Sequence, residues 1–471
     1  MSSISKLFAP RDMTKGTPWK GIVQFALPML IGNIAQQLYN TVDSIIVGKY
    51  VGDNALAAVG SAAPILNLLL VLFVGIATGA GIMVAQYFGA KDRDGLSHTI
   101  GVCVTLTGLA SLIIMVVGPL LTTPLLSALN TPDSIMKWCA DYLNIYYIGI
   151  AGFAYYNILA GVLRGLGDSL SALLFLIIAT ILNIILDIFF VANLGLGVAG
   201  VALATVIAQG LSAVLCIIKL GKMKNTFDFN LKMLNPKKEY SSKLIKLGLP
   251  SGLTQAIFSL AMIAVQSLTN SFGEMVIACN VIVMRVDAFA MMPNFTFGAA
   301  MTTYAGQNIG ARRMDRVNEG TKQGTLIAVG VTTVITVLIL IFGRGLMSIF
   351  TDTVELVDLG MRMMRILAIG YIAMAVTQSL SGVMRGAGDT MTPMWISIIT
   401  TVIIRVPIAY GLAYITRSAD FPTGRPESTF ISLVTSWTLG ALITTIFYKK
   451  GKWRNKAIIH NEIKEEEMAT M

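Results

Sequence analysis

Two acidic side chains lie inside apolar runs that are long enough to cross a membrane, where a charged group is costly and is therefore a candidate for function. Asp43 lies in the run 22–48 and Asp187 in the run 170–193. At a rise of 1.5 Å per residue, both lie roughly 8–10 Å below the expected outer ends of their runs. Two carboxylates at one depth could share a proton or hold a cation.

Neutral oxygen atoms accompany these two acids. Asn183 precedes Asp187 by four residues, so the two side chains share one helix face. Thr205 lies roughly 13 Å into the next run, 196–220. Carboxylate, amide and hydroxyl oxygens suit a hard cation. We therefore expect Asn183, Asp187 and Thr205 to form a sodium site near Asp43, unless the carboxylates bind a proton or are satisfied by neighbouring hydroxyls and amides.

A second group of charges lies in the run 275–308. Because positions i and i+2 do not face each other on a helix, Arg285 and Asp287 are expected to pair with different groups. They belong either to a charge network or to a substrate cavity. Met284 and Met291 could line such a cavity, since thioether surfaces re-pack around varied ligands, or they could fill the core.

One short motif occurs twice, about 221 residues apart. Ala160–Asp168 reads AGVLRGLGD, and Ser381–Asp389 reads SGVMRGAGD. Gln86 recurs as Gln307 with the same offset. A duplicated membrane domain is typical of secondary transporters. The paired motif lies in Gly-rich turns at the expected inner face, and we interpret six of its residues as hinges or clasps: Arg164, Gly165, Asp168, Arg385, Gly386 and Asp389.

The composition indicates an integral membrane protein. The chain is 55% hydrophobic and 13% charged, whereas soluble proteins carry roughly a quarter charged residues. The four cysteines form no C-x-x-C pair, so a zinc or redox site is not expected. Hydrolase, zincin and nucleotide-binding motifs are absent from the sequence, so we expect neither an enzyme nor a cofactor.

Twelve runs are expected as membrane spans: roughly 22–48, 54–88, 96–118, 134–163, 170–193, 196–220, 243–271, 275–308, 318–343, 356–384, 391–416 and 428–448.

The net charge of +10 reports topology rather than a nucleic-acid partner. Lys and Arg gather before the first run, around the central loop and after the eighth and twelfth runs, which predicts both termini on the cytoplasmic side of the cell membrane. Six spans per half give the halves one orientation, related by an axis along the membrane normal. The expected parts are an N-lobe 1–220, a cytoplasmic linker 221–242, a C-lobe 243–450 and a cytoplasmic tail 451–471.

Over about residues 20–450 the chain resembles the MATE family of multidrug and toxin extrusion transporters. The resemblance rests on LPMLIGNIAQQLYNTVDSIIVG, on the pairs AQYFGAKD/GQNIGARR and LRGLGD/MRGAGD, and on NIILD. It implies an all-α fold of twelve membrane helices in two pseudo-symmetric six-helix lobes. It also implies export of small organic, often cationic, compounds in exchange for Na⁺ or H⁺ by a protein that works as a monomer among membrane lipids. The family's first-lobe cation site matches Asp43, Asn183, Asp187 and Thr205, with Asn157 in the same polar network.

The second half departs from the pattern of the family. The run after Leu356 has Asp358 at its outer edge and no interior acid, and the run 243–271 has Gln255 and Gln266 but no interior Glu. We therefore expect coupling to rest on the first lobe. The alternative function is a lipid-linked oligosaccharide flippase of the same superfamily. Such flippases usually have a more cationic cavity, for which only Arg285 and Arg405 are counted as interior candidates.

Overall fold

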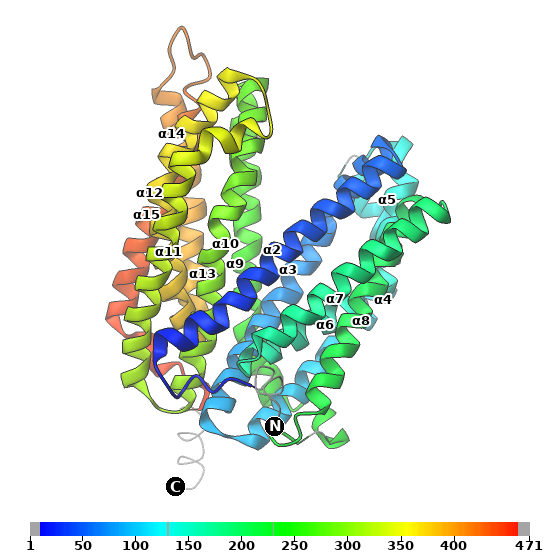
Figure 1. The fold of residues 1–471 in the computed structure, drawn as a ribbon, viewed down its shortest axis with the longest axis vertical. Helices are drawn as coiled ribbons and strands as arrows, with labels where there is room; N and C mark the ends of the chain where they lie inside the picture. Colours follow the sequence, from blue (N-terminus) through cyan, green and yellow to red (C-terminus); the bar gives the residue numbers. More distant parts are fainter. Residues whose placement is uncertain (1–9, 130, 229, 460–471) are drawn as a thin grey trace. The chain divides into compact units, whose positions relative to one another are not determined.

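The computed structural model describes residues 10–129, 131–228 and 230–459, and every regular element in these ranges is a helix. The expected cytoplasmic positions of the two chain ends concern residues 1–9 and 460–471, which lie outside the described residues. Long helices follow one another along the chain (Figure 1): α2 (Pro18–Tyr50), α3 (Asp53–Ala90), α4 (Arg93–Ala128), α5 (Asp133–Ile148), α6 (Ile150–Gly165), α7 (Ser169–Asp187), α8 (Gly197–Gly221), α9 (Lys238–Ser271), α10 (Glu274–Gly310), α11 (Met314–Ser348), α12 (Val354–Gly386), α13 (Met391–Ile398), α14 (Arg405–Ile415) and α15 (Glu427–Lys450).

Short helical segments complete the described chain. Two of them are π-helical turns, each in the fifth span of its half: η1 (Ile188–Asn193) continues α7, and η3 (Ile399–Ile404) joins α13 to α14. Two more are 3₁₀ turns, η2 (Leu231–Leu234) and η4 (Lys452–Asn455). A helix satisfies its own backbone hydrogen bonds, which is why apolar runs of this length fold as helices in a membrane.

The number of spans agrees with the sequence. In the described residues, 10 helices are long and apolar enough to cross a membrane, and the pair α5–α6, bent by 53°, makes an eleventh. Helix α2 is more polar but has 33 residues, roughly 50 Å at 1.5 Å per residue, which is ample for a crossing. Together with α2 these spans make the predicted all-α, twelve-helix membrane protein.

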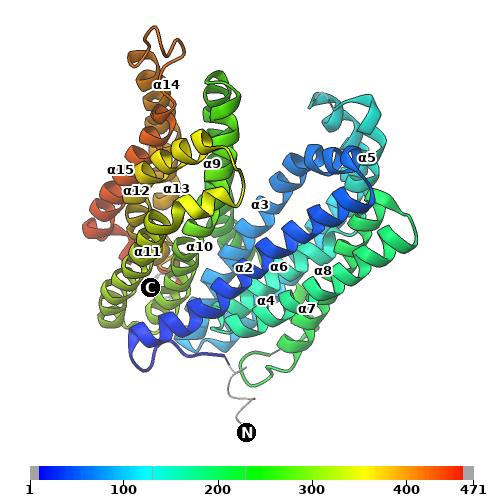
Figure 2. The ribbon, with the colours of Figure 1, turned by 45° about the horizontal axis from the view of Figure 1, so that its top comes forward.

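The chain divides into two compact units, and two of the three divisions pass through the long helices α2 and α9 (Figure 2). These two fall beside Pro28 in α2 and beside Pro250 in α9, whereas the third lies between Asp12 and Met13, before α2 begins. A proline inside a helix removes one backbone hydrogen bond and permits a bend there. The bounds differ from those of the expected lobes. Residues 13–26 of the expected N-lobe belong to unit 2, and residues 243–252 of the expected C-lobe belong to unit 1, as does the expected linker 221–242. Unit 1 is Met1–Asp12 with Leu27–Gly252, and unit 2 is Met13–Ala26 with Leu253–Met471.

The segment expected as a linker, 221–242, packs on unit 1. Arg93, at the start of α4, pairs with Asp228 at 2.6 Å and donates to the Lys224 carbonyl oxygen at 2.6 Å. Further along α4, Thr105 Oγ1 donates to the Leu234 carbonyl oxygen at 2.6 Å. The segment is therefore anchored along one helix by side-chain-to-backbone bonds.

In unit 2, the segment that leads into α2 is anchored at the corresponding place. The Gln307 side chain accepts from the Met13 backbone N–H at 2.8 Å. Arg316 donates to the carbonyl oxygens of Gly16, Met13 and Lys15 at 3.0–3.3 Å and to Asn308 Oδ1 at 3.0 Å. Gln307, the second copy of the repeated Gln, therefore binds the segment that precedes α2.

The repeated glycines allow two helices to approach closely in each unit. A Cβ at Gly165 would lie 2.6 Å from the Gly81 carbonyl oxygen of α3, and a Cβ at Gly386 would collide with the Thr302 carbonyl oxygen of α10. The residue two positions later, Gly167 or Gly388, has a φ of 85° or 93°, a left-handed conformation that suits glycine. The paired turns are thus tightly packed helix ends.

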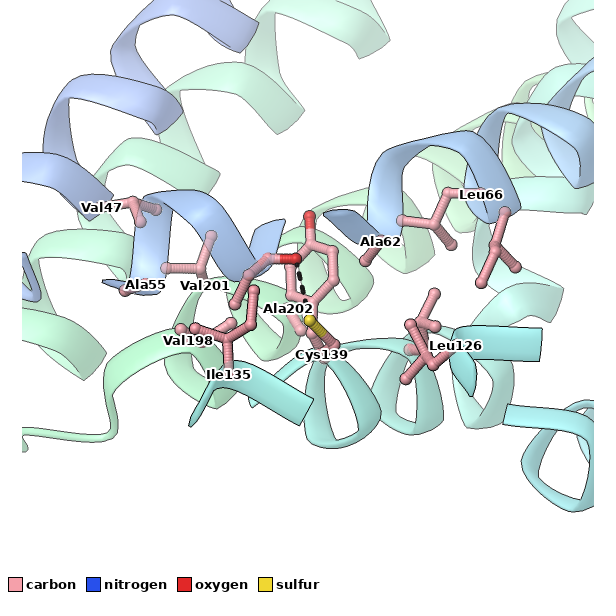
Figure 3. Close-up of a cluster of buried hydrophobic side chains, with 14 of the residues drawn as sticks. Val47, Ala55, Ala62, Leu66, Leu126, Ile135, Cys139, Val198, Val201 and Ala202 are labelled. Atoms are coloured by element: carbon pink, nitrogen blue, oxygen red, sulfur yellow. Dashed lines mark hydrogen bonds between the residues drawn. The ribbon is translucent and has the colours of Figure 1, made fainter. Parts of the chain in front are cut away.

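A buried apolar cluster holds α2, α3, α5 and α8 together in unit 1 (Figure 3). Val47, Cys139 and Val201 are among its residues, and Cys139 Sγ donates to the Ala58 carbonyl oxygen at 3.4 Å. Tyr142 belongs to the same cluster and lies one turn from Tyr146. The cluster therefore fixes the backbones that carry the polar residues described next.

Candidate functional site

Asp43 and Asp187 come together inside unit 1. Asp187 ends α7 and is 0% exposed, while Asp43, on α2, is half-buried. The two carboxyl groups lie within hydrogen-bonding distance of each other. Oδ1 of each group is buried and accepts no N–H or hydroxyl hydrogen from the described residues. Because two adjacent carboxylates in a low dielectric resist joint ionisation, this pair is suited to hold one proton or a cation.

Asn183 contacts Asp187 directly, and Thr205 is joined to Asn183. When the Asn183 amide is oriented to satisfy both of its atoms, its nitrogen donates to Asp187 Oδ2 at 2.9 Å, and its oxygen accepts from the Thr205 backbone N–H at 3.2 Å. Thr205 Oγ1 donates to the Val201 carbonyl oxygen at 3.1 Å. Asn183 and Thr205 are 1% and 4% exposed. Both side chains are therefore shielded from solvent beside the acidic pair.

Three tyrosines that were not predicted from the sequence complete the cluster. The Tyr39 hydroxyl lies 3.1 Å from Thr205 Oγ1. Tyr146 is within reach of Thr205, and its ring lies 4.9 Å from the ring of Tyr142. A signal was present, since Tyr39 stands four residues before Asp43, and Tyr142 four before Tyr146, which is the spacing of one helix face.

Local structure explains how the sequence places these groups. The Asp168 side chain accepts from the Ser171 N–H at 2.9 Å and so caps the start of α7. At the other end, Asp187 is the last residue before the π-helical turn η1. A π turn inside a span is frequently found at functional sites because it redirects side chains. The π-helical turn therefore begins directly after Asp187, the residue that carries the buried carboxylate.

The residues present fit a monovalent cation or a proton. Both acids have a buried oxygen without a hydrogen-bond donor among the described residues, and the hydroxyl groups of Tyr39 and Thr205 belong to the same cluster. Asn157, predicted in the same network, lies on α6 and donates to the Phe153 carbonyl oxygen one turn earlier at 2.9 Å. Its part in cation binding stays a prediction.

Unit 2 places an acidic side chain near a buried arginine. Asp287, on α10, lies beside the Tyr371 hydroxyl and close to Arg405. Arg405 is 8% exposed, and it directly follows the π-helical turn η3. Oδ1 of Asp287 and Nε of Arg405 have no hydrogen-bond partner among the described residues. Asp287 and Arg405 were each candidates from the sequence, but their proximity to each other and to Tyr371 was not predicted.

The other candidates of α10 take different positions. Arg285 is exposed, so it does not share the environment of Asp287. Met284 is 37% exposed and accepts a weak contact from Asn280 at 3.6 Å. Met291 is 7% exposed in the apolar core of unit 2, which makes it a packing residue there.

The paired motifs place their acids at helix starts. Asp168 caps α7 and lies 3.2 Å from Lys219 Nζ. Asp389 accepts from the Thr392 N–H at 3.2 Å and from Thr392 Oγ1 at 2.7 Å. Arg164 and Arg385 are half-buried on the last turns of α6 and α12. The hinge role of these residues stays a prediction.

Comparisons with known proteins identify the family. Among curated proteins, the probable multidrug resistance protein YoeA of Bacillus subtilis is 29% identical and covers 88% of this chain and 92% of its own length. The probable multidrug resistance protein YpnP of the same organism is 29% identical over 94% of this chain and 97% of its own length.

Solved structures agree on the fold. The outward-facing structure of a multidrug resistance MATE family transporter has a TM-score of 0.86 at 24% identity and covers 93% of this chain and 96% of that chain. The MatE family model matches the chain twice, at residues 28–189 and 250–411, one match in each half. Since the two matches cover more than half of the chain, the protein belongs to the MatE family, whose members are transporters.

Proposed function

We propose that the protein exports small organic compounds, in particular organic cations, across the cell membrane in exchange for Na⁺ or H⁺. The observation that carries the proposal is the Asp43–Asp187 pair, whose two buried Oδ1 atoms have no hydrogen-bond donor in the part of the chain that the structure describes. The names of the relatives, which are multidrug resistance proteins, support the substrate class. The same names favour export over the flippase alternative.

Coupling follows from the cost of burying charge. With neither proton nor cation, the pair would hold two negative charges in a low dielectric, so that state is disfavoured in any conformation that shields the site from water. Binding of a proton or cation removes this cost and makes the shielded conformation accessible. The Asn183 amide nitrogen, which donates to Asp187 Oδ2, stabilises the remaining charge.

The remaining expectations from the sequence belong to the same proposal. The two lobes 1–220 and 243–450 would share one orientation, with linker, tail and both termini in the cytoplasm. The protein would act as a monomer, without a cofactor, nucleic-acid partner or enzymatic activity. The turns at Gly165 and Gly386 would be the inner-face hinges.

The experiment is transport by the purified protein in vesicles. An imposed Na⁺ or H⁺ gradient should drive accumulation of a fluorescent organic cation, and the compound should in turn stimulate flux of the coupling ion. Gradients of each ion alone identify which one is used. Equal accumulation with and without either gradient would contradict ion-coupled export, and movement of a lipid-linked oligosaccharide instead would support the flippase.

A further inference from the structure

Unit 2 has a basic pocket that plays no part in the proposed coupling site. It has a volume of about 390 Å³ and lies between the C-terminal end of α11 and the N-terminal end of α12. This size falls within the range of small-molecule sites, ≈ 300–1,000 Å³. The lining contains three arginines and one acid among apolar side chains: Leu340, Ile341, Arg344, Asp358, Met361, Arg362 and Arg365.

The charges in the pocket do not cancel. Arg344 pairs with Asp358 at 2.6 Å, and Arg362 lies 3.6 Å from Glu427 of α15. In the part of the chain that the structure describes, no carboxylate lies within ion-pair distance of Arg365. The pocket therefore offers an uncompensated guanidinium group, which prefers a planar or tetrahedral oxyanion and binds phosphate through paired N–H donors.

The depth of these arginines matches the level of lipid headgroups. Helix α12 has 33 residues, roughly 50 Å in length, whereas the hydrocarbon core is roughly 30 Å thick. If the helix extends equally beyond both surfaces of that core, about 10 Å of it lies outside each surface. Arg362 and Arg365 lie roughly 12 and 16 Å from the helix start at Val354, so their long side chains can reach the boundary of headgroups and hydrocarbon.

The walls of the pocket fit an acyl chain. Leu340 and Ile341 are 38% and 65% exposed, one turn deeper along α11 than Arg344. Exposed apolar side chains continue along this helix at Val334, Val337 and Leu338. A ligand with an anionic head and an apolar body would contact the arginines and this surface together, which a soluble phosphate ester would not.

We propose that this pocket binds the headgroup phosphate of an anionic phospholipid, with Arg365 as its unpaired anchor and Leu340 and Ile341 against the first part of an acyl chain. The site is independent of ion coupling, because it lies in unit 2 and shares no residue with the Asp43–Asp187 cluster. The ligand would be a structural lipid that joins the ends of α11 and α12.

Native mass spectrometry of the full-length protein, titrated with phosphatidylglycerol or phosphatidylcholine, tests the proposal. The wild-type protein should bind phosphatidylglycerol more tightly than phosphatidylcholine. Arg365→Gln should weaken that binding by roughly tenfold or more, the scale of one charge-assisted hydrogen bond. Arg365→Lys, which keeps the charge but not the paired N–H donors, should weaken binding less than Arg365→Gln does. The matched control is Arg417→Gln, which removes an exposed arginine outside the pocket and should leave binding unchanged.

Two results would overturn the proposal. One is equal phosphatidylglycerol affinity in wild type, Arg365→Gln and Arg362→Gln. The other is binding of sn-glycerol 3-phosphate as tight as that of the lipid, which would assign the pocket to a soluble phosphate ester. Thermal unfolding of every variant in phosphatidylcholine alone verifies folding. If Arg365→Gln fails that check, Arg362→Gln, which removes a second arginine of the pocket, carries the comparison.

Discussion

The carboxyl group of Asp43, on α2, lies within hydrogen-bonding distance of the carboxyl group of Asp187, on the last turn of α7. The Asn183 amide and the Thr205 backbone N–H extend this contact to α8. The cluster thus joins the first, fifth and sixth spans of one half through side chains. If the pair binds the coupling ion as proposed, its occupancy should alter how these three helices pack.

Removal of either carboxylate should abolish ion-driven export. Asp43→Asn and Asp187→Asn each keep the shape of the side chain but cannot release a proton or bind a cation by charge. We expect loss of gradient-driven accumulation in vesicles, with exchange of labelled substrate across the membrane retained. The matched control is Asp133→Asn, an exposed acid at the start of α5. Full ion-driven export by the double variant would sink the proposed mechanism.

Removal of the Tyr39 hydroxyl should weaken the site moderately. Tyr39→Phe deletes the 3.1 Å contact with Thr205, a neutral hydrogen bond worth about 1 kcal/mol, or roughly fivefold in an equilibrium constant. The concentration of coupling ion at half-maximal transport should rise by about that factor. Tyr155→Phe loses one hydroxyl bond, to the Val104 carbonyl oxygen, and should leave this concentration unchanged. Equal effects of both substitutions would show a general packing effect.

A branched side chain at the repeated glycines should destabilise the protein. In Gly165→Val the new atoms meet the Gly81 carbonyl oxygen, and in Gly386→Val they meet the Thr302 carbonyl oxygen. Overpacking of this kind costs about 1–3 kcal/mol, and should lower the unfolding temperature and the folded yield. Gly330→Ala is the control, because no neighbouring helix comes within 4 Å of the position that the new Cβ would take. If the hinge prediction is also right, surviving protein will transport slowly while binding substrate normally.

Acid should release the segment 224–234 from α4. The hydrogen bonds from the Arg93 guanidinium lower the pKa of the Asp228 carboxyl below its ordinary value. A carboxyl with a lowered folded-state pKa stabilises docking above its ordinary pKa, about 3.9, and this contribution is lost as the pH falls through the folded value. Amide hydrogen exchange of the segment, corrected for intrinsic rates, should accelerate below about pH 4. Arg93→Gln should remove this dependence; an unchanged profile would refute it.

Asp287 and Arg405 in unit 2 should depend on each other. Arg405→Gln removes the cation near Asp287, whose Oδ1 has no hydrogen-bond partner among the described residues, and should lower the unfolding temperature. The double variant Arg405→Gln/Asp287→Asn should recover part of this loss, because no charge remains unpaired. Thermal unfolding in detergent measures the loss of stability in the single variant and its recovery in the double variant. Arg285→Gln, on the same helix but exposed, should have little effect, and additive losses in the double variant would argue against the pairing.

Local pattern and composition determined much of this protein. Apolar runs of about 20 residues predict spans because only a helix satisfies its backbone in lipid, and twelve helices follow. The motif that recurs about 221 residues later indicates that the chain consists of two related halves. The depth of Asp43 and Asp187 and the four-residue spacing of Asn183 and Asp187 identified the polar cluster, since helix geometry converts sequence distance into depth and face.

Tertiary structure alone decided which distant groups meet. Nothing in the spacing shows that Tyr39 and Tyr146 lie against Thr205, that Arg405 lies near Asp287, or that the residues around Arg365 form a pocket. The glycines of the repeat suggested flexible turns, but their neighbours are backbone atoms of α3 and α10, so close packing is what requires them. Contacts between helices depend on rotation and side-chain volume, which periodicity along one chain does not encode.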